Sequence, residues 1–434
     1  MKTTFKCAAL ASALMPFAIP ATAAAGPAVA ASVVALPSAA GVERFYQSRS
    51  NAPLWFKAGA SVSAASQLVA ILRRAQLDGL SGGPELANLA QAAVQRAQSG
   101  NPADLAQAER TLSATWVLYV QALGKPAAGM EYGDAFVMPR TFPAEVILQQ
   151  ADAAPSLQQH LQSVSSINPI YAQLRDAAWA EMQSGVEPAR RIVANLDRAR
   201  ALPSRGRSVI VDVASARLFM MQDGRVQDTM KVIVGQPVAG KQTPLVASTI
   251  HYATYNPYWH VPPEMVRRII AKNVLSQGES YLRSRGYQVV DGYTDNARVL
   301  GTSEVNWKAV ASGQQQVWLR QLPGKGNSMG AMKFNFPNQS GIYLHDTPQK
   351  ELFAKANRNL SAGCIRLEDA PRLASWLMNG SGTAPSSTPE QHVKLPQGVP
   401  VYVTYLTAQA DGGQLTYLPD RYGLDTQGLA AVGN

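Results

Sequence analysis

The sequence predicts an α+β protein in which a helical N-terminal domain is followed by a mainly β domain. From Val42 to about Ala201 the chain is rich in Ala, Gln and Leu, and its apolar residues recur at helical spacing. From Ser208 onwards, β-rich runs are separated by turn residues. The N-terminus, in addition, has residues typical of an exported protein.

The N-terminus has the order of a secretory signal peptide. Lys2 and Lys6 precede a short apolar run, and small residues follow at Ala21, Ala23 and Ala25. The run is too short for a comfortable bilayer span, with an uncleaved anchor helix as the alternative. We therefore expect a signal peptide at 1–25, a linker at 26–41 and a periplasmic protein without a stable membrane anchor.

The chain is basic, with a formal net charge of +10. Basic residues of an exported protein could meet nucleic acid, anionic lipid or an anionic wall polymer. Here they are scattered rather than clustered, and export argues against nucleic acid as a partner. We interpret the charge as an ordinary solvated surface.

The helical domain is expected to span residues 42–203. In SQLVAILRRAQLDGL the leucines and isoleucine lie near helical spacing, and Gly79 marks a stop. LAQAERTLSATWVLYVQALG repeats the pattern and also ends in Gly. RRIVANLDRARALP predicts an amphipathic helix that is closed by Pro203.

The mainly β domain is expected at 204–408. SVIVDVASARLFMMQDGRVQDTMKVIVG consists of β-rich runs with Asp223-Gly224 as turn chemistry, and GIYLHD and PVYVTYL follow later. Such runs favour a sandwich or a barrel. Residues of about 257–328 predict a cap of helix and loop inserted into this domain, and 409–434 is expected to be a C-terminal extension.

Cys364 is the one cysteine that remains when the predicted leader, with Cys7, is removed. In an oxidising compartment such a cysteine indicates intermolecular pairing, a buried inert thiol or a reactive thiol. A reactive thiol needs a base, and His345 lies nineteen residues earlier, at the end of an apolar β run. We expect Cys364 in a loop just ahead of a helix that has Pro371 in its first turn. From the pair alone, a core thiol and an unrelated histidine remain the simpler interpretation.

Neighbouring residues extend this pair into a longer motif. HDTP…LSAGCIRLEDA resembles the active-site signature of the L,D-transpeptidases with a YkuD-type catalytic domain: a His, a variable spacer, then Ser-x-Gly-Cys-x-Arg. The matching residues are Ser361, Gly363, Cys364 and Arg366. Many members have a second His where this chain has Ala362. A small residue at this position resembles the pattern of the YcbB-like branch. The Gly often found after the first His is Asp346 here.

The resemblance extends over most of residues 43–405. The segments that look like YcbB-like elements are FYQSRSNAPLW, LDGL, RIVANLDRAR, VIVGQPVAGKQTP, YNPYWHVPPEM and MKFNFPN. The small peptidoglycan-binding module of that branch has no counterpart, because only about twenty residues, from Gln173 to Arg190, stand in its place. The resemblance therefore implies a β-sandwich catalytic domain that holds its substrate with the inserted cap.

The family pattern implies a role for each residue of the motif. Cys364 would be the nucleophile and His345 the base, while Gly363, Ser361 and Tyr343 would support the oxyanion hole and the active-site loop. Tyr343 lies two residues before His345, so on a strand the two would face the same side. An ordinary strand aromatic and a turn-capping serine are the structural alternatives for Tyr343 and Ser361.

Further residues are candidates for substrate binding. Arg366 could hold a peptide carboxylate, with a surface arginine as the alternative. The other candidates, which could equally serve strand, turn or aromatic packing, are Asn335, Phe334, Tyr255 and Trp259. No spacing of His, Cys and Asp suggests a metal site, so we expect no metal and no cofactor.

The resemblance implies a peptidoglycan L,D-transpeptidase, a cysteine acyltransferase of cell-wall biogenesis and cell shape that crosslinks stem peptides through a thioester. Its partners would be a donor stem and a diaminopimelate acceptor, with carbapenems as inhibitors. The crosslink would be 1–3, from L-Ala to diaminopimelate, or 3–3, and the missing module favours the first. The alternatives are an L,D-carboxypeptidase that hydrolyses stem peptides and a non-catalytic wall-binding scaffold protein.

Overall fold

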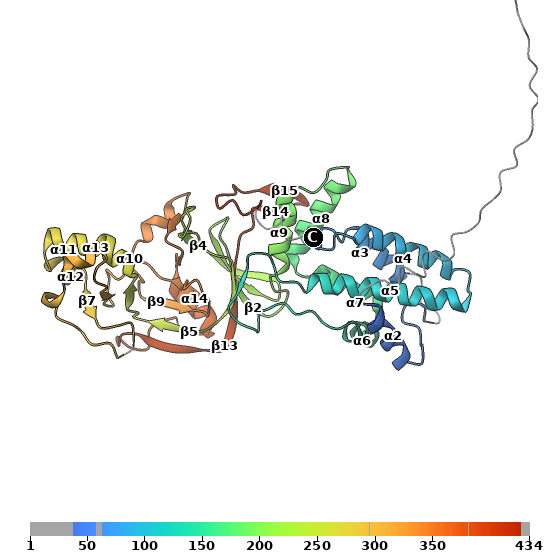
Figure 1. The fold of residues 1–434 in the computed structure, drawn as a ribbon, viewed down its shortest axis with the longest axis horizontal. Helices are drawn as coiled ribbons and strands as arrows, with labels where there is room; N and C mark the ends of the chain where they lie inside the picture. Colours follow the sequence, from blue (N-terminus) through green and yellow to red (C-terminus); the bar gives the residue numbers. More distant parts are fainter. Residues whose placement is uncertain (1–37, 58–62, 295, 381, 427–434) are drawn as a thin grey trace, which may run out of the picture.

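The N-terminal part of the chain is a bundle of helices (Figure 1). A computed structural model of the chain describes residues 38–57, 63–294, 296–380 and 382–426. The predicted signal peptide, Cys7 and most of the predicted linker lie outside these residues, and the last residues of that linker already belong to a helix. The helices of this part are α2 (Ala39–Ser48), α3 (Ser63–Arg73), α4 (Gly83–Ala97), α5 (Pro102–Leu123), α6 (Ala144–Ala153), α7 (Leu157–Ser166), α8 (Pro169–Gln183) and α9 (Arg190–Arg200).

A buried carboxylate ties the segment after α2 to α5. Glu109, which is 4% exposed, accepts hydrogen bonds from the backbone N–H groups of Leu54, Trp55 and Phe56. It also accepts one from the hydroxyl of Tyr46 at 2.7 Å. These hydrogen bonds compensate the negative charge of the Glu109 carboxylate, which is buried away from water. They also hold the irregular segment against the bundle.

The strand-rich second domain is confirmed, and its sheet closes on itself. β5 pairs with β13 at one side and with β9 at the other, so the path through β13, β2, β3, β4, β12, β10 and β9 returns to its start. The sandwich expected from the sequence thus takes the form of one curled sheet. Its strands are β1 (Glu131–Tyr132), β2 (Arg207–Asp212), β3 (Arg217–Gln222), β4 (Arg225–Gly235), β5 (Val246–Tyr255), β9 (Met332–Asn335), β10 (Leu344–His345), β11 (Asn359–Ser361), β12 (Ile365–Leu367) and β13 (Gln391–Thr404).

Alternation along the strands separates a core face from an opposite face. Leu344, Ile365 and Phe334 have no exposed surface and lie in one apolar cluster inside the sheet. The helix α14 (Ala370–Met378) packs on this cluster through Leu373 and Leu377. Because successive strand residues point to opposite faces, the residues between these core positions face away from the core. Those residues form the candidate site.

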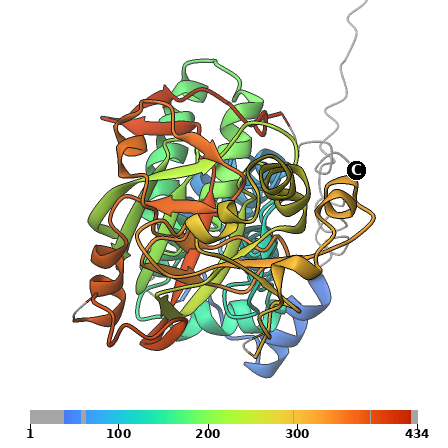
Figure 2. The ribbon, with the colours of Figure 1, turned by 90° about the vertical axis from the view of Figure 1, so that its left-hand side faces the viewer.

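The chain between β5 and β9 forms a cap at one end of the molecule, seen end-on in Figure 2. It has its own apolar cluster, which includes Val261, Ile270 and Leu319. The sheet order is β6-β8-β7, separate from the main sheet. The elements are β6 (Trp259–Val261), α10 (Pro263–Met265), the π-helix η1 (Val266–Ile270), α11 (Ala271–Gln277), α12 (Ser280–Ser284), β7 (Tyr287–Val290), the 3-10 helix η2 (Thr302–Glu304), α13 (Trp307–Ser312) and β8 (Trp318–Gln321).

Two segments join the helical bundle to the β domain. A strap, residues 124–143, adds β1 to the edge of β5 in parallel. The hairpin of β14 (Ala408–Asp411) and β15 (Gln414–Tyr417) lies beside α8 and α9, between the two halves in Figure 1. Within the described ranges, no helix has the length and apolarity needed to span a bilayer.

Candidate active site

Strand register places the residues of the motif on one face of the sheet. β10 runs parallel to β12, with Leu344 opposite Ile365 and His345 opposite Arg366. Since Leu344 and Ile365 point into the core, His345 and Arg366 point to the opposite face. Cys364 and Tyr343, directly before these pairs, belong to that face too. Pairing of β10 with β12 therefore brings segments that lie about nineteen residues apart in the chain side by side.

The imidazole of His345 is fixed by a backbone carbonyl. His345 is 3% exposed, and its Nδ1 lies 2.6 Å from the carbonyl oxygen of Asp346. A carbonyl only accepts, so Nδ1 carries the hydrogen in this contact and Nε2 is left as the basic nitrogen. The residue that replaces the usual Gly after the histidine therefore orients the base through its main chain.

Both oxygens of the Asp346 carboxylate have a hydrogen-bond partner. The carboxylate accepts hydrogen bonds from Lys350 Nζ at 2.6 Å and from the backbone N–H of Ala331 at 2.8 Å. Gly330 has a φ of +64°, and a Cβ there would lie 2.3 Å from an Asp346 carboxylate oxygen. The turn before β9 thus requires Gly at this position, both for its left-handed backbone and for space.

Cys364 lies in a tight turn between β11 and β12. The Ser361 hydroxyl donates to the Cys364 carbonyl at 2.6 Å and accepts from the Gly363 N–H at 3.2 Å. Gly363 has a φ of +130°, which a side chain would disfavour. The predicted loop is confirmed, but β12 separates Cys364 from α14, where Pro371 occupies the first turn as expected. The N-terminus of that helix is therefore not beside the thiol.

Tyr343 contacts both members of the Cys–His pair. Its ring lies edge-on to the imidazole of His345, with centroids 5.8 Å apart. Its hydroxyl and its backbone also lie close enough to the thiol to lower the pKa of Cys364. Burial and the neighbouring sulfur raise the pKa of the Tyr343 hydroxyl, so it remains a protonated donor.

The resting pair is uncharged at neutral pH. Burial, assisted by the positive charge of Arg366, lowers the pKa of His345 to about 4. Burial raises the pKa of the Cys364 thiol, although Tyr343 and Arg366 act in the opposite direction. These pKa shifts therefore favour a thiol that loses its proton as it attacks, rather than a standing thiolate–imidazolium pair.

Two cavities flank the segment before His345. One, of about 590 Å³, is lined by the active-site turn at Ala362 and Gly363, by the strap at Ala128 and Gly129, and by Tyr422. The other, of about 440 Å³, is lined by Tyr343 together with Asn335 and Tyr252. The two cavities thus border the active-site turn and Tyr343, the immediate neighbours of the pair.

The predicted substrate-binding residues divide between these surfaces and the core. Asn335 lines the second cavity, and its buried side-chain oxygen has no hydrogen-bond partner among the described residues. Arg366 shares the face of Cys364 and donates to Gln349 at 2.8 Å. Phe334 and Tyr255 do not reach the site. The structure places both in the apolar core, at 0% and 2% exposure, because they occupy inward positions of their strands.

Trp259 belongs to the cap rather than to the cavities. It is half-buried on β6 and packs against the apolar cluster of the cap, with Tyr287 at a ring distance of 6.4 Å. In the described part of the chain, no three His, Cys, Asp or Glu side chains are grouped as a metal site would require.

Two residues near the active-site turn were not singled out from the sequence. Thr243 donates from its hydroxyl to the Gly363 carbonyl at 2.7 Å, and the Tyr422 hydroxyl lies 3.2 Å from the Thr243 backbone nitrogen. Thr243 falls inside the family-like segment VIVGQPVAGKQTP, which was the available signal. Tyr422 lies in the C-terminal extension, where no motif pointed to it.

Two parts of the chain match models of known domain families. Residues 206–403 match the model described as the L,D-transpeptidase catalytic domain, YkuD, and residues 40–177 match the model described as the Scaffold domain. The chain carries an L,D-transpeptidase catalytic domain. A Haemophilus influenzae protein described as "Putative L,D-transpeptidase" is 26% identical over 395 residues, which cover 88% of this chain and 78% of the relative.

Solved L,D-transpeptidases resemble part of the chain. One from Mycobacterium smegmatis has 15% identity and a TM-score of 0.24, over 46% of this chain and 58% of that chain. L,D-transpeptidase 3 from Mycobacterium tuberculosis, in complex with a faropenem-derived adduct, has 15% identity and a TM-score of 0.22, over 46% and 60%. This chain therefore spans less than two thirds of each of these two structures.

The L,D-transpeptidase domain follows the helical bundle through a short connection. The Scaffold match covers α2 to α7 and most of α8, and the loop from α8 to α9 runs only over residues 184–189. The segment from Gln173 to Arg190, where the YcbB-like branch would carry its binding module, consists of most of α8, this loop and the first residue of α9.

Proposed function

We propose that this protein is a peptidoglycan L,D-transpeptidase in which Cys364 carries the acyl group and His345 is the base. The observation that supports this most is the register of β10 and β12, which sets Tyr343, His345, Cys364 and Arg366 on one face. The family match of the domain supplies the reaction class. A purely structural wall-binding protein would have no need for this arrangement.

In the first half of the reaction, Cys364 attacks the carbonyl carbon of an L,D peptide bond in the donor stem. Its proton passes to Nε2 of His345 as the C–S bond forms. The negative charge on the carbonyl oxygen is held by the Cys364 N–H and by the Tyr343 hydroxyl. The intermediate then expels the leaving amine, which takes the proton from His345, and a thioester remains on Cys364.

In the second half, the side-chain amine of a diaminopimelate residue on the acceptor stem attacks the thioester. His345 accepts a proton from the attacking amine and returns it to the departing sulfur. An amide crosslink forms and the Cys364 thiol is restored. No redox step is involved.

Of the two possible linkages, we propose the 1–3 crosslink from L-Ala to diaminopimelate. The short loop between α8 and α9 leaves no separate binding module, as in the relatives associated with this linkage. The donor bond would then be the one that follows L-Ala, and the rest of the donor stem would leave. Incubation with defined muropeptides and mass spectrometry of the dimers tests this, because a 3–3 product would instead release a terminal D-Ala.

Replacing the nucleophile tests the chemistry directly. Cys364→Ala should abolish both crosslinked products and the mass increase expected from a carbapenem adduct, because no other described residue offers a thiol at this face. Intact-protein mass spectrometry measures the adduct. A variant that still becomes labelled at the same rate would exclude Cys364 as the nucleophile. Trimmed monomers without dimers from the wild type would indicate a carboxypeptidase instead.

We further propose that the protein acts in the periplasm, where stem peptides are crosslinked. The support is the order of charged, apolar and small residues in 1–25. N-terminal sequencing of protein recovered from the periplasmic fraction tests this. An intact Met1 in a membrane fraction would contradict it.

A further inference from the structure

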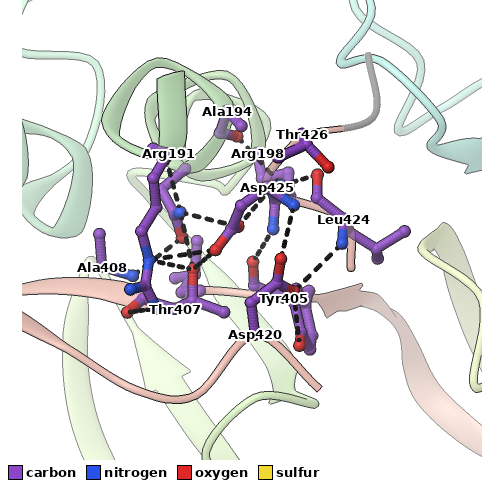
Figure 3. A network of polar contacts seen from close by, with 12 residues as sticks. Arg191, Ala194, Arg198, Tyr405, Thr407, Ala408, Asp420, Leu424, Asp425 and Thr426 are labelled. Carbon is purple, nitrogen blue, oxygen red and sulfur yellow. Dashed lines mark hydrogen bonds and ion pairs between the residues drawn. The ribbon is translucent and has the colours of Figure 1, made fainter. Parts of the chain in front are cut away.

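The C-terminal tail, residues 418–426, is anchored on α9. Figure 3 shows Asp425 between the two arginines of that helix and the end of the β domain. Asp425 is 4% exposed. It accepts hydrogen bonds from Thr407 at 2.7 Å and from Arg198 at 3.0 Å, and it forms an ion pair with Arg191 at 3.1 Å. A buried carboxylate with this many partners holds its segment in one place.

A second carboxylate closes the turn of the tail. Asp420 accepts hydrogen bonds from the Tyr405 hydroxyl at 3.0 Å and from the backbone N–H groups of Leu424 and Asp425 at 3.1 Å. Tyr422 lies within this turn, and its ring stacks on Tyr405 with centroids 5.2 Å apart and planes 8° apart. The turn thus aims Tyr422 into the L,D-transpeptidase domain.

The hydroxyl of Tyr422 holds the loop between β4 and β5. It donates to the Gly235 carbonyl at 2.7 Å and accepts from the Thr243 N–H at 3.2 Å. Gly235 in turn donates to the Thr243 hydroxyl at 2.8 Å. A Cβ on Gly235 would lie 2.5 Å from the Thr243 nitrogen, so these backbones touch directly.

Thr243 connects this loop to the nucleophile. Its hydroxyl, already an acceptor from Gly235, donates to the Gly363 carbonyl at 2.7 Å. The peptide between Gly363 and Cys364 is planar and trans, so its C=O and N–H point in opposite directions. Fixing the Gly363 carbonyl therefore fixes the direction of the Cys364 N–H.

We propose that the C-terminal tail is a positioning element of the active site, in which Tyr422 and Thr243 aim the Cys364 N–H at the oxyanion. Neither residue touches the reacting atoms. The inference rests on the proposed role of Cys364 as the nucleophile. It also explains why Tyr422 and Gly363 line the same cavity, since the tail supplies one wall of it.

Two reactions of Cys364 separate this role from a merely structural one. Acylation by a carbapenem develops negative charge on a carbonyl oxygen and so uses the Cys364 N–H, whereas alkylation by iodoacetamide is a displacement that forms no oxyanion. Both rates are measured on the full chain by intact-protein mass spectrometry, well below the unfolding midpoint of each variant. The variants are Thr243→Val, which keeps the shape but loses the hydroxyl, Thr243→Ser, which restores it, and Tyr422→Phe.

We expect Thr243→Val to slow acylation about 10-fold or more while alkylation stays near the wild-type rate. Thr243→Ser should recover the rate of acylation. Tyr422→Phe should slow acylation by a smaller factor, again with alkylation near the wild-type rate. Tyr417→Phe, at an exposed tyrosine of β15 in the same region, is the matched control and should change neither rate. Equal loss of both reactions, or acylation of Thr243→Val at the wild-type rate, would overturn the inference. Failure of the proposed function would appear already in the wild type, as absence of acylation.

Discussion

The imidazole of His345 provides a prediction at the scale of one residue. Its pKa is lowered to about 4 by burial and by Arg366, and the neutral form is the one that accepts the Cys364 proton. The rate of Cys364 acylation should therefore stay high as the pH falls through 6.5, the ordinary histidine value, and decline only near pH 4 to 5. A decline centred at 6.5 or above would contradict this.

Arg366→Gln is the matched variant for this pH profile. Removing the positive charge should raise the pKa of both His345 and Cys364, because Arg366 lowers each of them. The acidic limb of the pH profile, set by His345, and the alkaline limb, set by Cys364, should then both move to higher pH. Circular dichroism must accompany the measurement, since the unfolded chain takes up a proton below pH 6.5 while folded His345 stays neutral, and this reduces stability as the pH falls toward 4.

At this scale the sequence predicted the motif residues but not all of their surroundings. His345 and Arg366 lie next to core positions in short strands, Cys364 lies in the turn just before β12, and the family motif marks all three directly. Phe334 and Tyr255 were selected from equally suggestive segments, yet they face the core. A motif marks a segment, whereas strand alternation decides which of its side chains reach the site.

Glu109 provides a prediction at the scale of the elements. Glu109→Ala would leave the buried N–H groups of Leu54, Trp55 and Phe56 without an acceptor. We expect a loss of about 2–4 kcal/mol in the free energy of unfolding, measured by urea titration. Glu187→Ala, in the exposed loop between α8 and α9, is the control and should be close to neutral.

Periodicity predicted the long helices but not how the irregular segments are held. The helix predicted before Gly79 ends at Arg73, and the following turns place Leu77 in the core of the β domain rather than in the bundle. Glu109 sits in a regular helix and shows no pattern of its own. Its importance depends on three N–H groups more than fifty residues away, which no local spacing reveals.

At the scale of the whole molecule, long-range contacts complete the active site. The sequence indicated two parts and a cap, but the closure of the sheet depends on the pairing of β5 with β9. The strap and the tail each come from outside the core of the β domain, and both line the larger cavity beside Cys364. The helical bundle therefore does more than precede the catalytic domain, because its strap forms part of the wall of this cavity.

Gly133 tests this role of the strap. A Cβ at this position would lie 1.8 Å from the Pro337 carbonyl oxygen, so Gly133→Ala must push the strap away from the loop that follows β9. Ala128 and Gly129, which line the larger cavity, would move with it. We expect a loss of about 1–3 kcal/mol in stability and a raised KM for crosslinking, with kcat less affected because the ladder of β10 and β12 is untouched. Gly82→Ala, where a Cβ meets nothing within 4 Å, should change neither quantity. If Gly133→Ala lowered kcat alone, the strap would act on the reacting groups and not on the walls that hold the stem peptide.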